Sequence, residues 1–140
     1  MMNYTRTKAW FFLSIALALV PGVSPGQEKR MTVDELTKRA DAVVVGKVTG
    51  LESEWSSDRS RIYTRVTLGV DRYLKGQGEG ASITILTPGG EIGDVGEVYS
   101  HMPTFHKDEN VVVFVEKDSE GRYRVAGGIQ GKLMILQAIR

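Results

Sequence analysis

The chain has 140 residues, 18 Lys and Arg against 17 Asp and Glu, and no cysteine. The lack of cysteine excludes disulfides, thiolate metal ligands, thiol catalysis and covalent haem attachment. The near-zero net charge, with basic residues scattered along the chain, argues against nucleic-acid binding.

The amino terminus, residues 1–26, is predicted to be a secretory signal peptide. Its only charges are Arg6 and Lys8, and the apolar run Ala9–Val20 follows them. That run has 12 residues, about 18 Å as a helix, which is short for a hydrocarbon core of about 30 Å. Gly26 is a small residue that permits cleavage after it. We expect a secreted or periplasmic protein with no stable membrane span after cleavage; an uncleaved membrane anchor is the alternative.

Residues 31–140 are predicted to form one domain that begins with a short helix. Thr32 and Glu35 have the spacing of a capping box, which predicts a helix from Val33 to about Ala40. The apolar residues expected on its buried face are Val33, Leu36 and Ala40.

From Ala42 onward, short apolar and alternating runs predict strands. They are expected at Ala42–Val48, Ile62–Val70, Ser82–Leu86, Asn110–Glu116 and Tyr123–Ala126. The even-numbered residues of the second run should face the core. The fourth run is apolar on both faces, which is typical of a central strand. Gly46, inside the first run, predicts a bulge or a bend.

The connections are less regular. Residues 52–60 are polar and are predicted to link two strands of a hairpin. Thr87–Gly96 contains four glycines and is expected to be a long, specially shaped loop. Lys132–Ile139 is apolar on both parities and fits either a buried strand or a short helix.

This spacing of strands predicts a mainly β fold, either a small antiparallel barrel or a sandwich. The order of the pieces resembles the netrin-like module, the OB-type barrel of tissue inhibitors of metalloproteinases and related secreted proteins. The matching pieces are ADAVVVGKVTGLE, RIYTRVTLGVDRYLKG, SITILTPGG and ENVVVFVEKDSEGRYRVAGG, which cover about Ala40 to Gly131. The pattern also resembles that of a group of exported bacterial proteins.

The resemblance implies a small antiparallel OB-like (netrin-like) barrel, preceded in this chain by an N-terminal helix. The inhibitors begin with a cysteine that chelates the zinc of the protease, and disulfides stabilise their barrel. This chain has no cysteine. No inhibitory residue is therefore carried over, and the resemblance bears on fold and secreted setting more than on function.

Four residues are candidates for a binding surface. Trp55 lies in a polar connection, where an exposed aromatic side chain would suit a partner; alternatively, it folds back onto the end of the barrel. Tyr63, Arg65 and Tyr73 have the outward parity of their strand, on the face with which OB barrels bind oligomeric ligands. Their alternative role is to cover the solvated side of the sheet.

A metal site is a further candidate. His101 and His106, with Asp108 or Glu109, offer two imidazoles and a carboxylate; the alternative is two unliganded histidines on a surface loop. Three acids of the glycine-rich segment also offer oxygen ligands for calcium, although their spacing matches no known calcium loop: Glu91, Asp94 and Glu97.

No catalytic motif stands out: there is no G-x-S-x-G elbow and no phosphate-binding glycine motif. We therefore expect an exported, non-catalytic binding or interaction module without a cofactor, whose partner is an extracellular or periplasmic protein. Two alternatives remain open. One is a metal-binding protein or metal-dependent hydrolase that uses the loop of His101 and His106, and the other is a structural component of the cell envelope.

Overall fold

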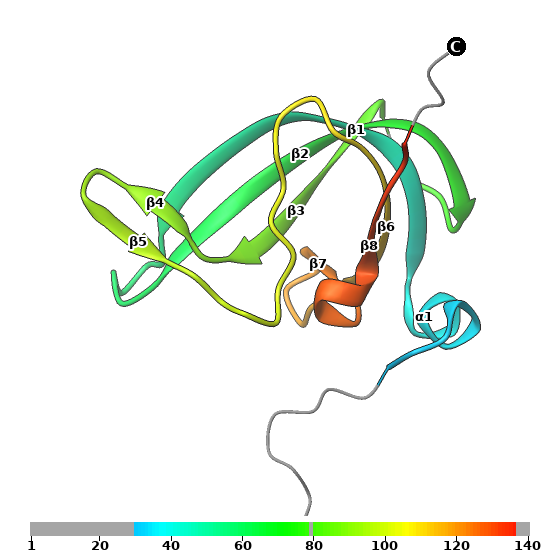
Figure 1. Ribbon diagram of the computed structural model, residues 1–140, viewed down its shortest axis with the longest axis horizontal. Coiled ribbons are helices and arrows are strands. Elements are labelled where there is room, and N and C mark those ends of the chain that lie inside the picture. Colours follow the sequence, from blue (N-terminus) through cyan, green and yellow to red (C-terminus); the bar gives the residue numbers. More distant parts are fainter. Residues whose placement is uncertain (1–29, 79, 137–140) are drawn as a thin grey trace, which may run out of the picture.

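The computed structural model describes residues 30–78 and 80–136, so the predicted signal peptide lies outside the described residues. The protein is mainly β (Figure 1). In the described part, no helix has the length and apolar character needed to span a membrane. The elements are helix α1 (Val33–Arg39), strands β1 (Ala42–Trp55), β2 (Ile62–Lys75), β3 (Ser82–Pro88), β4 (Gly90–Ile92), β5 (Val95–Glu97), β6 (Asn110–Lys117) and β7 (Tyr123–Val125), the 3-10 helix η2 (Gly128–Gly131) and strand β8 (Lys132–Met134).

In the larger sheet, the series of paired strands both begins and ends at β1. It runs through β1, β2, β3, β7 and β6, and β6 pairs with β1 again. Four of these pairings are antiparallel, and the one between β3 and β7 is parallel. Because β1, β2 and β3 follow one another and β6 returns beside β1, the order is that of a Greek key. Strand β8 adds to β6, and β4 and β5 form a separate hairpin.

The two longest strands, β1 and β2, curve over the molecule in Figure 1. Their register shifts at three places, one of them beside Gly46. A Cβ atom on Gly46 would lie 2.2 Å from the carbonyl oxygen of Gly69 on β2. Only glycine permits this approach of two backbones, so the predicted irregularity at Gly46 is confirmed.

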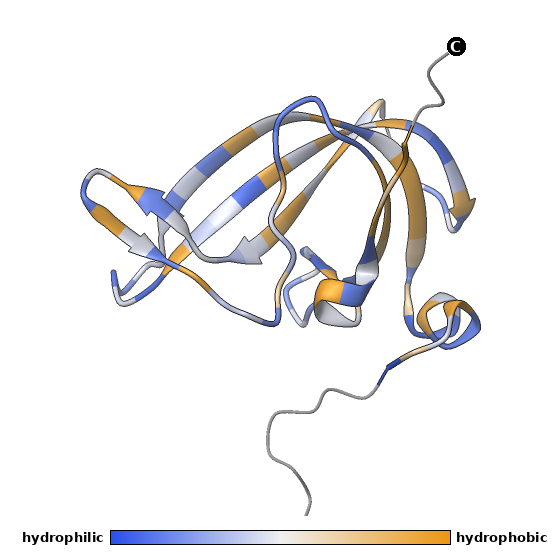
Figure 2. Ribbon diagram, in the orientation of Figure 1, coloured by the Kyte–Doolittle hydropathy of each residue, from blue (hydrophilic) through white to orange (hydrophobic). Residues whose placement is uncertain are grey.

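The main core lies on the inner side of the paired strands β1, β2, β3, β7 and β6. The even-numbered residues of β2 up to Val70 lie on the inner face as predicted, and Ile62, Val66 and Leu68 are fully buried. In Figure 2, apolar and polar segments alternate along β1 and β2, as expected for strands with one buried face. Burial of this apolar surface is the dominant stabilising term of the fold.

Strand β6 is buried on both faces, as predicted for a central strand. Val111, Val113 and Val115 belong to the main core. Phe114 points to the other side and packs with Leu36 of α1 in a second, smaller cluster. The helix therefore covers the outer face of β6 and the start of β1.

The capping box of α1 is present, because Thr32 and Glu35 bond reciprocally. The expected buried face is wrong in one position: Val33 is 62% exposed, whereas Leu36 and Ala40 are buried. Met31, before the helix, packs against the second cluster in its place.

The prediction of a long loop over Thr87–Gly96 is wrong, since this segment forms most of the β4–β5 hairpin. Ile92 pairs with Val95 across the two-residue turn Gly93-Asp94, and Gly93 has a positive φ of 59°. Gly-Asp between two β-branched residues is a hairpin signal that the glycine count obscured. The segment Lys132–Ile139, predicted as either a buried strand or a short helix, is described as far as residue 136 and contains strand β8, in which Leu133 and Met134 are exposed rather than buried.

Candidate functional site

A cleft of about 570 Å³ lies between the β4–β5 hairpin and the segment 98–106. Its floor is the inner face of β1 and β2, where Leu51 pairs with Val66 and Ser53 pairs with Thr64. Partners in an antiparallel ladder share a face, so these four side chains point to the same side. In Figure 1 the segment after β5, drawn in yellow, crosses in front of the long strands. Its lining residues include Val98, Tyr99, Met102, Pro103, Thr104, Phe105 and His106.

The first wall of the cleft, the hairpin, is fixed to the floor through the backbone of Gly89 and Gly90. Gly89 donates its N–H to the carbonyl of Ile62 at 2.8 Å, and its own carbonyl accepts from the Thr64 hydroxyl at 2.7 Å. A Cβ on Gly90 would lie 2.5 Å from the Thr64 Oγ1 atom. The glycines thus let the hairpin lie directly on β1 and β2.

The two acids that line the hairpin wall differ in their surroundings. The carboxylate of Glu97 accepts from the backbone N–H of Ile62 and from the Tyr99 hydroxyl, both at 3.2 Å. Arg61 in turn donates to the Tyr99 oxygen at 2.6 Å, and this bond raises the pKa of Arg61. The carboxylate of Glu91 has no hydrogen bond or ion pair with any residue in 30–78 or 80–136.

The second wall, segment 98–106, is held in place by contacts with the charged Lys132. The Lys132 ammonium lies 2.7 Å from a carboxylate oxygen of Glu109, with side chains only 9% and 11% exposed. It also donates to the Thr104 carbonyl and lies 4.9 Å from the centre of the Phe105 ring. His106 Nδ1 lies 2.9 Å from the other Glu109 oxygen. Burial raises the pKa of Glu109, but the hydrogen bonds from Lys132 and His106 outweigh it and hold that pKa below its usual value.

The residues predicted as one binding surface lie on different faces. The prediction that Trp55 lies in a connection is wrong, because β1 continues through residues 52–55 and Trp55 is its last residue. Trp55 pairs with Ile62, so it lies on the inner side of the sheet, whereas Tyr63 pairs with Glu54 on the outer side. Arg65 is also on the outer side and forms an ion pair with Glu54 at 3.0 Å. The Trp55 ring is half-buried, beneath the guanidinium of Arg59.

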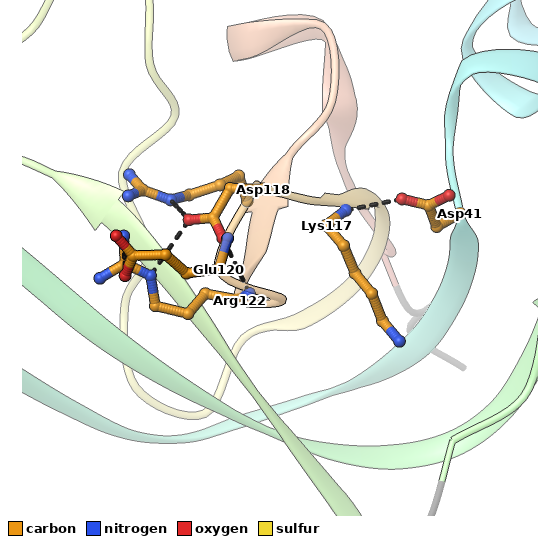
Figure 3. Close-up of polar contacts among 6 residues, drawn as sticks. Asp41, Lys117, Asp118, Glu120 and Arg122 are labelled. Carbon is orange, nitrogen blue, oxygen red and sulfur yellow. Dashed lines mark hydrogen bonds and ion pairs between the residues drawn. The ribbon is translucent and has the colours of Figure 1, made fainter.

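The cationic groups near Tyr63 are engaged within the chain. The guanidinium of Arg124 lies 5.3 Å from the centre of the Tyr63 ring, and its Nε donates to Asp118 at 3.1 Å. Figure 3 shows Asp118 at the turn between β6 and β7, where it also accepts from the backbone N–H groups of Glu120 and Arg122. These bonds, led by the one from the Arg122 backbone, lower the pKa of Asp118 to about 2. The two cations beside Tyr63, Arg65 and Arg124, are therefore already paired with carboxylates.

Tyr73 is placed differently from the prediction. Its side chain packs against the main core, and its hydroxyl is buried without a hydrogen-bond partner in the described part. Gly46 pairs with Val70 and Val45 with Arg72, so β2 has one extra residue between them. This bulge reverses the alternation and turns Tyr73 inward.

Of the candidate metal ligands, His106 and Glu109 are in contact, at 2.9 Å, but the two histidines lie in different places. His101 lines a different groove, next to α1 and η2, whereas His106 lines the cleft. Asp108 bonds through its backbone N–H to the carbonyl of Val48 at 2.8 Å. Within the described ranges, no group of three or more His, Cys, Asp or Glu side chains has a geometry that would hold a metal ion.

Sequence reasoning missed the cleft because its lining combines residues of β1 and β2 with the later stretch 87–106. The available signal was weak: Val98, Met102 and Phe105 are apolar residues in a connection that is mostly polar. Phe105 is buried in the main core, which anchors that connection.

No protein-family model matches the chain, and no match is found among curated proteins or solved structures.

Proposed function

We propose that this protein is an exported, non-catalytic binding module, and that the cleft between the hairpin and segment 98–106 is its ligand site. The cleft itself carries the proposal. Its floor combines the apolar Leu51 and Val66 with the hydroxyls of Ser53 and Thr64, and carboxylates line the hairpin wall. Its size is within the range of ligand sites. Its partner is an extracellular or periplasmic protein.

The fold is proposed to be an OB-type barrel similar to the netrin-like module. Support comes from the five strands that return to β1 in Greek-key order. OB barrels bind through their strand faces and loops, which is compatible with a ligand site beside a hairpin. Export rests on the basic and apolar pattern of residues 1–26.

The absence of catalysis is proposed from how the polar groups of the cleft are used. The Thr64 hydroxyl donates to Gly89, and the Ser53 oxygen accepts from the N–H of Glu91. His106 is paired with Glu109. Neither hydroxyl is hydrogen-bonded to a histidine of the described residues, so these contacts offer no nucleophile with an adjacent base.

The test of the binding site is cross-linking at the cleft in the exporting cell. A photoreactive p-benzoylphenylalanine replaces Val98, which lines the cleft and is 90% exposed, or Val33 on α1 as control. We expect one dominant adduct from position 98, absent from position 33, that disappears when Leu51→Lys is added. Equal adducts from both positions, or none from position 98, would contradict the proposal.

The export part is tested separately by mass spectrometry of the secreted protein. Cleavage is expected between about Val20 and Gln27. Recovery of intact Met1 in exported, membrane-extracted protein would replace the cleaved signal with an anchor.

A further inference from the structure

We propose that the occupant of the cleft is an extended polypeptide segment of the partner that carries a large apolar side chain next to Lys or Arg. This inference rests on the proposed function and names the chemistry of its ligand. Two features of the cleft carry it: apolar side chains that remain exposed, and an unbalanced negative charge on one wall.

The apolar part comes from the floor and the second wall. Leu51 is 41% exposed and Val98 is 90% exposed, and Met102 is half-buried. All three line the cleft above buried residues such as Val66 and Phe105. An apolar side chain placed here would remove this surface from water, which is the main source of affinity in such sites.

The charge comes from the hairpin wall. Residues 87–98 contain Glu91, Asp94 and Glu97 and no Lys or Arg. Glu97 is engaged by Ile62 and by Tyr99, to which Arg61 donates. The carboxylate of Glu91 has no hydrogen bond or ion pair with residues 30–78 and 80–136, although Glu91 lines the cleft. A cation beside the apolar anchor would therefore complement Glu91.

The shape of the site favours a chain over a small molecule. The cleft between the hairpin and the adjoining segment 98–106 is open to the surface. An extended segment can enter such a cleft from the side and place alternate residues on the floor and at the wall.

The test uses three fluorescein-labelled peptides on the exported protein. The basic probe is Gly-Ser-Lys-Phe-Lys-Ser-Gly; a second peptide has Glu in place of each Lys, and a third has Ser in place of Phe. By fluorescence polarisation we expect the basic probe to bind most tightly and to weaken as salt is raised. An acidic peptide that binds equally well, or a Phe-free peptide that does, overturns the inference.

Matched variants locate the contact. Glu91→Gln should weaken the basic probe about two- to fivefold, as expected for an exposed ion pair. Glu52→Gln is the control, because Glu52 is exposed on the opposite face of β1 from Leu51. Leu51→Ser should weaken the probe as well, whereas Val33→Ser on α1 should not. Equal effects of Glu91→Gln and Glu52→Gln would contradict the assigned role of Glu91.

NMR of the same titrations separates this inference from the proposed function. If all peptides shift the amide signals of Leu51 and Val98 equally, the cleft is a binding site and the basic, apolar class is wrong. If no peptide shifts them and cross-linking from Val98 also fails, the proposed function fails too.

Discussion

Among individual residues, the Tyr73 hydroxyl is the clearest departure from good packing. It is buried without a hydrogen-bond partner in the described part of the chain, and burial raises the pKa of Tyr73. Because an unsatisfied buried hydroxyl is costly, Tyr73→Phe should raise the free energy of unfolding by about 1 kcal/mol. Urea denaturation measures this, with Tyr99→Phe as a control that removes a bonded hydroxyl. A loss of stability in Tyr73→Phe would show that the hydroxyl has a partner.

Asp118 is a second single residue with a measurable effect, because it makes the stability of the protein depend on pH. Hydrogen bonds from the Arg122 backbone and from Arg124 lower its pKa from 3.8 to about 2. A carboxyl whose pKa is lowered by folding stabilises the protein above its unfolded pKa, and that contribution is lost as pH falls through the folded pKa. The melting temperature should therefore decline between about pH 4 and pH 2. Asp118→Asn should flatten that decline, measured by circular dichroism.

A neighbouring carboxyl on the same turn supplies the control. Glu120 is 66% exposed in its side chain and bonds Arg122 at the surface. Glu120→Gln should leave the decline of the melting temperature at acid pH nearly unchanged. If both variants flatten it equally, the dependence belongs to the general charge of the turn.

At the scale of the elements, the pairing of β1 with β2 depends on how closely their backbones approach. Two glycines of β1 differ in this distance and so provide a matched test. A Cβ on Gly46 would lie 2.2 Å from the Gly69 carbonyl oxygen, whereas one on Gly50 would lie 3.8 Å from Thr67. Gly46→Ala should therefore cost about 2 to 3 kcal/mol because the strands must separate, and Gly50→Ala should be nearly neutral. Thermal denaturation of the two variants checks this. Similar stabilities would mean that the strands can shift without cost.

Most strands could be predicted from alternation, and the failures have local causes. The even-numbered face of β2 was predictable up to Val70, beyond which one extra residue reverses the parity and brings Tyr73 inside. No apolar pattern reports a bulge of this kind, because register depends on the partner strand. The β4–β5 hairpin was readable from Gly93-Asp94, but three further glycines nearby favoured a loop.

At the scale of the whole molecule, the β architecture was accessible from sequence and the site was not. Trp55 and Tyr63 are close in sequence, yet they lie on opposite faces of one sheet. Conversely, Leu51, Glu91 and Phe105 are far apart in sequence and line one cleft. The position of segment 98–106 decides this arrangement, and long-range contacts fix that position.

One of those long-range contacts is the nearly buried pair of Lys132 and Glu109, which connects β8 to the wall of the cleft through Thr104 and His106. Their side chains are 9% and 11% exposed, and the charged atoms are 2.7 Å apart. Lys132→Met would leave the Glu109 carboxylate buried with only His106 beside it, and should cost about 2 kcal/mol of unfolding free energy.

The double variant Lys132→Met/Glu109→Gln should be more stable than Lys132→Met alone, because no uncompensated charge then remains buried. Urea denaturation of the wild type, of Lys132→Met and Glu109→Gln alone and of the double variant gives the coupling, and hydrogen exchange at Phe105 and His106 reports whether the wall loosens. If the two substitutions are additive and those amides stay protected, segment 98–106 is held by the burial of Phe105. If the effects of the two substitutions are not additive and those amides lose protection, the ion pair of Lys132 and Glu109 keeps the second wall of the cleft in place.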